Sequence, residues 1–145
     1  MPSSTTSDYL FDRQVASVLR QEVYTPPTAL YVGLFTTKPA LTGTGGVEVV
    51  SNANTNYARV TIPSNSSNWS EPSGINRQFS NLNDVVFGVP GTQSWGTITG
   101  MGLFDAATGG NLLWVGDIGT SRPVSSGDGA PRILQGQMKI SRSVC

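Results

Sequence analysis

The chain has 145 residues, of which 37% are hydrophobic and only 12% charged, and its formal net charge at pH 7 is zero. This length predicts one domain with a buried core, and three Trp, four Tyr and five Phe argue against disorder of the whole chain. The neutral balance argues against nucleic acid or an anionic membrane as a partner, and the single cysteine, Cys145, excludes an internal disulfide.

The first seven residues are polar and predict an N-terminal arm without structure of its own, ahead of a single β-rich domain at residues 8–145. The arm has neither a basic nor an apolar segment, so it does not resemble a secretory signal peptide. No stretch of the chain approaches the roughly 20 apolar residues of a membrane-spanning helix. We therefore expect a protein that is made in a cytoplasm and has no membrane partner.

A helix is predicted from Asp8 to about Val23. Ser7 is a suitable N-cap, and Asp8 lies near the positive end of the helix dipole. Apolar side chains then recur with the spacing of an amphipathic helix, at Phe11, Val15, Val18 and Leu19. The proline pair at 26–27 must stop the helix, because proline lacks a backbone donor and disfavours helical geometry before it.

Strand-like segments separated by turns rich in Gly, Pro and Asn follow the helix. A continuous apolar run at 29–37 predicts a buried strand. Two further runs, at 98–104 and 112–118, flank the turn at 105–111, where Gly109 and Gly110 can adopt the positive φ of a tight reversal. The remaining strand candidates are 47–50, 57–62, 82–89 and 132–140. This pattern predicts a mainly β fold, a β-sandwich or jelly-roll-like domain with one short N-terminal α-helix.

The residue types that most enzymes and metal sites need are scarce. The chain has no histidine, which removes the commonest general base and the imidazole ligand. Cys145 alone cannot form a thiolate zinc site. Nine carboxylates remain, mostly in turns or at element ends, so a pair for glycoside hydrolysis is the less favoured alternative. We predict no enzyme activity, no catalytic residue, no metal and no cofactor.

Two loops have both a functional and a structural interpretation. Segment 105–111 carries oxygen ligands for calcium, but it lacks the spacing and terminal Glu of an EF-hand, and a plain β-turn fits better. Segment 43–46 is glycine-rich, but neither a Lys–Ser/Thr pair nor a helix start follows it, so it does not predict a phosphate site.

Aromatic and basic residues offer candidate contact sites. Trp69 lies in the polar loop 63–81, where an anchor beneath the loop or an interface residue is favoured over a ligand platform. Arg132, Lys139 and Arg142 form a mild basic cluster near the C-terminus. A solvated strand edge explains this cluster, and an acidic partner surface is the alternative.

Three segments together resemble a family of small virion proteins of tailed bacteriophages. They are Ala-Leu-Tyr-Val-Gly-Leu-Phe-Thr-Thr at 29–37, Asn-Tyr-Ala-Arg-Val at 56–60, and the stretch from Ser94 to Trp114 with Trp-Gly-Thr and Phe-Asp-Ala-Ala-Thr-Gly-Gly-Asn. Similar proteins include capsid cement, or decoration, proteins of phages that infect cyanobacteria, and many relatives carry the name tail fibre protein. The family has no catalytic motif to transfer.

The resemblance implies a structural virion protein, first of all a capsid cement protein on the capsid surface. It would bind the major capsid protein as a homotrimer and stabilise the assembled lattice by mass action. The alternative is a tail fibre or another tail-associated protein that contacts a receptor, and a more distant one is a carbohydrate-binding module. The residues that we expect at the interface with the partner are Pro2, Ser3, Ser4, Trp69, Glu71, Arg132 and Arg142.

Overall fold

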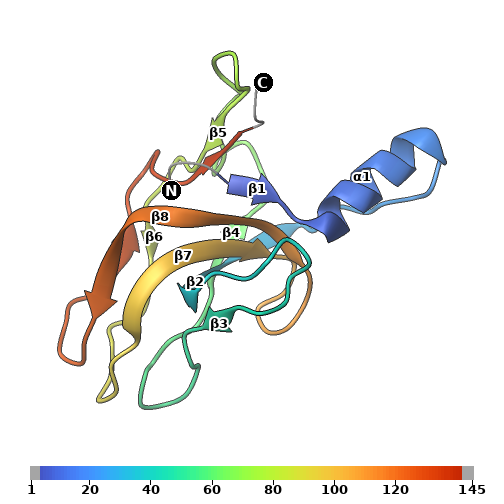
Figure 1. Ribbon diagram of the computed structural model, residues 1–145. Coiled ribbons are helices and arrows are strands. Elements are labelled where there is room, and N and C mark those ends of the chain that lie inside the picture. The colour runs from blue at the N-terminus through green and yellow to red at the C-terminus, as the bar shows by residue number, and fades with distance from the viewer. Residues whose placement is uncertain (1–3, 142–145) are drawn as a thin grey trace.

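The computed structural model describes residues 4–141 and is mainly β, with antiparallel sheets and one short helix near the N-terminus, as the sequence predicts (Figure 1). In chain order the elements are β1 (Ser4–Thr6), α1 (Asp8–Leu19), β2 (Ala29–Thr37), β3 (Val47–Glu48), β4 (Val60–Pro63), β5 (Phe79–Ser80), β6 (Val85–Val86), β7 (Gly96–Phe104), β8 (Leu112–Val124), β9 (Arg132–Ile133) and β10 (Lys139–Ile140).

The main sheet has six strands in the order β1-β8-β7-β2-β3, with β4 also paired to β2. One edge of β2 is shared, because Ala29–Val32 pair with β4 and the far end pairs with β3. The remaining short strands form two separate pairs, β5 with β10 and β6 with β9. The segment at 132–140, expected as one strand, is therefore divided between two small sheets.

The β7–β8 hairpin lies at the centre of the main sheet and confirms the hairpin predicted from the sequence. Its turn uses the left-handed backbone at Gly109 and Gly110, with φ of 59° and 72°. β8 continues well beyond the expected strand, so the hairpin curves around the body of the protein (Figure 1). This curvature accompanies a register shift between Ile98 and Gly100.

Side chains of the main sheet alternate between two cores, as the pleat of a strand requires. Leu30, Val32 and Leu34 of β2 enter the larger core, which also contains Val85, Phe87 and Met138 from the segments of the small sheets. The opposite face carries a smaller cluster of Phe35, Phe104, Leu112 and Val115. The apolar run at 29–37 is thus continuous because both faces of β2 are covered.

The prediction of an N-terminal arm without structure of its own is wrong from Ser4 onward. Ser4 and Thr6 pair with Gly116 and Trp114 of β8, so β1 forms one edge of the main sheet. The polar composition of this segment gave no apolar periodicity, and the strand exists because β8 offers it a free row of backbone partners. Pro2 and Ser3 lie outside the described residues.

The helix begins where the sequence predicts but ends four residues early. The N–H of Leu10 donates to Ser7 Oγ, which confirms Ser7 as the N-cap. At the other end the N–H groups of Arg20 and Glu22 both donate to the carbonyl of Ala16, and Gln21 takes a φ of 55°. This left-handed residue closes the helix before the proline pair is reached.

The apolar stripe of the helix does not pack on the core. Leu10 is buried, whereas Phe11 is 58% exposed and Val18 and Leu19 are each 77% exposed. The cause is the position of α1, which projects beyond the edge of the sheet (Figure 1). Only its first turn reaches the buried region, through Leu10.

Candidate functional site

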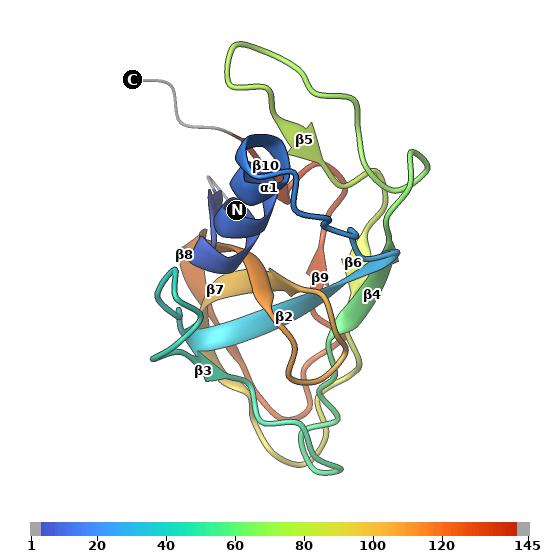
Figure 2. The same cartoon turned by 90° about the vertical axis from the view of Figure 1, so that its right-hand side faces the viewer.

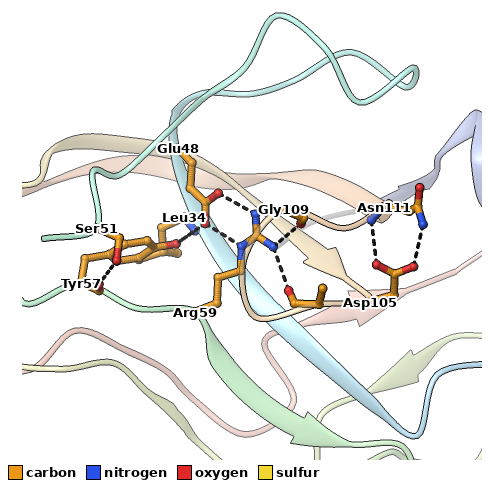
Figure 3. Close-up of polar contacts among 9 residues, drawn as sticks. Leu34, Glu48, Ser51, Tyr57, Arg59, Asp105, Gly109 and Asn111 are labelled. Carbon is orange, nitrogen blue, oxygen red and sulfur yellow. Dashed lines mark hydrogen bonds and ion pairs between the residues drawn. The ribbon is translucent and has the colours of Figure 1, made fainter.

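A buried polar cluster joins β3, the segment before β4 and the β7–β8 turn (Figure 3). Nε and Nη2 of Arg59 donate to the two carboxylate oxygens of Glu48, each at 2.8 Å. Nη1 of Arg59 donates to the carbonyls of Ala106 and Gly109, also at 2.8 Å. The Arg59 side chain is only 7% exposed. A single guanidinium therefore ties a short edge strand to the hairpin turn.

Tyr57 extends the cluster into the core. Its hydroxyl donates to Glu48 Oε1 at 2.8 Å and accepts from the Leu34 N–H at 2.9 Å. Burial raises the pKa of Tyr57 well above its usual value of about 10, and the charge on Glu48 adds to the rise. The ring packs edge-on against Trp95. Tyr57 is consequently held neutral and is a structural hydrogen-bonding group.

The turn at 105–111 is closed by its own side chains. The Asp105 carboxylate accepts from the backbone N–H of Asn111 at 2.7 Å and from its Nδ2 at 2.8 Å. These bonds use both carboxylate oxygens, so the segment is a hydrogen-bonded turn. Among residues 4–141, no group of three Asp, Glu, His or Cys is placed to hold a metal ion.

Two glycines opposite each other make room for the cluster. Gly33 and Gly102 are paired across β2 and β7. A Cβ on Gly33 would lie 2.9 Å from Glu48 Oε1 and 3.2 Å from the Phe104 ring. The three segments that carry the phage-protein resemblance, at 29–37, 56–60 and 94–114, therefore meet at this cluster. The donors and acceptors that they contribute to it are paired within the fold. The cluster offers no open reaction site.

The candidate contact residues fall into separate regions. Ser4 is buried in β1, and its Oγ donates to the Lys139 carbonyl at 3.0 Å, so it presents little surface. Arg132 lies in β9, 3.9 Å from Asp84, and lines a cavity of about 640 Å³. Only Trp69 and Glu71 line the same groove. Pro2, Ser3 and Arg142 fall in the part of the chain that the structure does not describe.

The groove that contains Trp69 and Glu71 has a volume of about 580 Å³ and is mainly apolar. Its walls come from α1, from the segment that follows the helix, and from the loop before β5, and Leu30 of β2 and Leu113 and Trp114 of β8 also line it. The apolar side chains that shape it include Leu10, Tyr24, Pro26, Trp69, Phe79 and Ile140.

Trp69 is both an anchor and a wall of this groove. Its side chain packs against the main core, and its backbone forms an isolated bridge with Asn81. Nε1 of Trp69 is buried and has no hydrogen-bond partner among the described residues. The anchor interpretation of Trp69 is therefore supported by its packing, while its place in the groove keeps the interface interpretation open.

Sequence reasoning missed the groove because its walls are far apart in the chain. The one available signal was the apolar stripe of the helix, which carries Phe11, Val18 and Leu19 and which the fold leaves exposed. An amphipathic helix whose apolar face meets no core indicates a contact with something else. No helix within residues 4–141 is long and apolar enough to cross a membrane.

Comparison with known families finds a match that covers almost the whole chain. The family model described as podophage GP4 fiber I protein gp80 matches residues 5–141. No curated protein matches the chain. The resemblance to small virion proteins of tailed phages is thereby confirmed, and the matched range includes most of β1, the polar cluster and the residues that line the groove. The chain belongs to the family of podophage fibre proteins represented by the GP4 fiber I protein gp80.

Proposed function

We propose that this protein is a structural component of a podophage tail fibre and acts by contact with other proteins. The observation that carries the proposal is the family match over residues 5–141, whose description names a fibre protein. A match of this extent includes the helix and every described strand except the first residue of β1, so it applies to the domain as a whole.

This proposal replaces the capsid cement function, which was the first expectation from the resemblance. The cement function, and with it the major capsid protein as partner, came from the resemblance to decoration proteins. The fibre description favours the alternative, a tail-associated protein. A virion location is common to both, and the tail is the part of the virion that we propose.

The two prominent features of the structure support a contact role over catalysis. The polar cluster around Arg59 is consumed by internal hydrogen bonds, so it has no group left for a substrate. The groove beside Trp69 is mainly apolar and adjoins a helix with an exposed apolar stripe. Surfaces of this kind mark protein interfaces. We further propose that copies of the chain associate about a rotation axis, as the homotrimer implied by the resemblance would.

Location and copy number in purified virions test the proposal. Immunogold labelling with an antibody to this chain is expected at the tail, and quantitative mass spectrometry is expected to give far fewer copies than of the major capsid protein. Labelling over the whole capsid, with a copy number close to that of the major capsid protein, would restore the cement function and overturn the tail assignment.

A further inference from the structure

Aromatic rings from four separate parts of the chain line the groove beside Trp69. Figure 2 shows α1 and the segment around β5, which both contribute to its walls, at the same end of the molecule. The aromatic lining residues are Tyr24, Trp69, Phe79 and Trp114. None of the ring–ring contacts within residues 4–141 joins two of these four side chains. The rings therefore line the groove as separate surfaces and do not stack on one another.

The rings offer the groove hydrocarbon surface and few hydrogen bonds. Nε1 of Trp69 is buried, so the part of this ring that lines the groove consists of carbon atoms. Phe79, which is 40% exposed, has no polar atom to offer. A lining of this kind suits a ligand with an apolar outer surface, and it suits a neutral sugar poorly, because a sugar needs many hydrogen bonds.

The charge that lines the groove is negative. Glu71 is the one charged lining residue among residues 4–141, and no Lys or Arg of that part of the chain lines the groove. The Glu71 carboxylate also has no ion pair with any described residue. The faces of aromatic rings carry the negative part of a quadrupole. The rings and the carboxylate therefore attract a ligand of the same sign, a cation.

We propose that the groove binds a small organic cation with an apolar outer surface, a quaternary alkylammonium group. Such a group has no N–H, so it loses no hydrogen bond when it enters a hydrocarbon-lined site. Aromatic faces attract it through cation–π contacts, and the carboxylate of Glu71 adds a direct charge attraction. The volume of about 580 Å³ lies within the range of small-molecule sites, about 300–1,000 Å³.

The absence of lining cations decides between two sources of the same group. The choline headgroup of a phospholipid carries a phosphate beside its ammonium group, and phosphates are bound by Arg or Lys. No such residue lines the groove within residues 4–141. The ligand is therefore a free molecule without a phosphate, and a membrane surface is the less suitable source.

The groove and the exposed stripe of α1 are distinct surfaces. The stripe reaches the groove only through Leu10, which is buried, and Gln14, which is polar. Phe11, Val18 and Leu19 lie outside the lining of the groove. The stripe thus remains available for the protein contacts of the proposed fibre role, and the ligand site is a function in addition to that role.

Isothermal titration calorimetry on the purified full chain with choline chloride tests the site. The matched ligand is the uncharged isostere of choline, in which a carbon atom replaces the quaternary nitrogen. Both molecules have the same shape, and the isostere leaves water more easily, so a preference for choline reports the charge. We expect choline to bind more tightly than the isostere by roughly fivefold or more.

Two variants separate the charge from the rings. Glu71→Gln is expected to weaken choline binding several-fold and to leave binding of the isostere unchanged. Asp117→Asn is its matched control, because it removes a carboxylate that is 64% exposed and lies outside the groove. Phe79→Leu keeps an apolar side chain but removes the ring, so it should also weaken choline binding several-fold.

The control for Phe79→Leu is Phe11→Leu, since Phe11 is 58% exposed and does not line the groove. Circular dichroism and thermal unfolding check that the variants fold, which they should because all of the replaced side chains are exposed. Equal affinity for choline and its isostere, or no saturable binding of choline, overturns the proposal. So does an unchanged affinity for choline in Glu71→Gln or in Phe79→Leu.

Co-sedimentation with phosphatidylcholine vesicles distinguishes the two sources of the ligand group. We expect no binding to the vesicles, and binding to vesicles without binding to free choline would overturn the assignment to a small molecule. All of these measurements use the isolated chain. Their outcome is therefore independent of whether labelling of virions places the protein on the tail or on the capsid.

Discussion

The guanidinium carbon of Arg59 lies 3.5 Å from the centre of the Phe104 ring. This stacking holds one face of the guanidinium against the hairpin while its edges bond Glu48 and the turn carbonyls. Arg59 therefore connects two parts of the main sheet by charge, by hydrogen bonds and by its aromatic contact.

Arg59→Ala is expected to lower the free energy of unfolding by about 3 kcal/mol, because Glu48 and two carbonyls lose their partner in a largely buried place. Arg20→Ala is the control, since the Arg20–Glu22 pair has side chains that are 73% and 42% exposed and should contribute less than about 1 kcal/mol. Urea denaturation measures both. Equal losses of unfolding free energy would show that the buried cluster stabilises the protein no more than an exposed ion pair does.

Stability is expected to fall as the pH rises above about 10, because unfolded tyrosine ionises there while Tyr57 in the fold keeps its proton. The contribution of Tyr57 is complete below that pH and declines above it, by about 1.4 kcal/mol per pH unit for one proton. Denaturation curves between pH 8 and 11, as a rough range, should show a smaller decline for Tyr57→Phe than for the wild type. Identical slopes would contradict the role assigned to the hydroxyl.

Gly110→Ala is expected to destabilise the protein much more than Gly109→Ala. Both positions have positive φ, which costs a non-glycine residue about 1 kcal/mol. At Gly110 the new Cβ would also lie 2.5 Å from Asp105 Oδ1 and 2.6 Å from the Ala106 Cβ, whereas at Gly109 it meets nothing within 4 Å. Thermal unfolding should separate the two, with Gly129→Ala, which has open space and ordinary φ, close to wild type.

Trp69→Phe is expected to keep the stability of the protein within about 1 kcal/mol, because it preserves most of the packing and removes the Nε1 that has no acceptor among the described residues. Trp69→Ala should cost about 3 kcal/mol and also open a wall of the groove. Incorporation into virions should fall for Trp69→Ala by more than its melting temperature accounts for. If incorporation into virions falls only as far as the melting temperature accounts for, Trp69 anchors its loop to the core and makes no contact with a partner.

Local signals were enough to predict the centre of the fold. β2 matches the apolar run at 29–37 residue for residue, and the β7–β8 turn was readable from Gly109, Gly110 and Asn111. Ser7 was also readable as the N-cap. In each case the signal and the structure lie within a few consecutive residues, so no knowledge of distant partners is needed.

The remaining features depend on distant partners and could not be predicted in this way. β1 is a strand only because β8 lies beside it, and its polar residues carry no periodicity of their own. The bond between Arg59 and Glu48 needs the register of β3 against β2. The groove likewise joins Leu10, Trp69 and Ile140, which are far apart in the sequence. Identifying its candidate residues required the complete topology.

The hydrogen bond from Ser4 Oγ to the Lys139 carbonyl brings the first and last described strands together. A short linker between these two strands should therefore produce a circularly permuted protein without disturbing the main sheet. New termini could be opened at the exposed turn of residues 125–129, outside the groove. Such a permutant would carry a fluorescent or affinity label on a surface where it leaves α1 free.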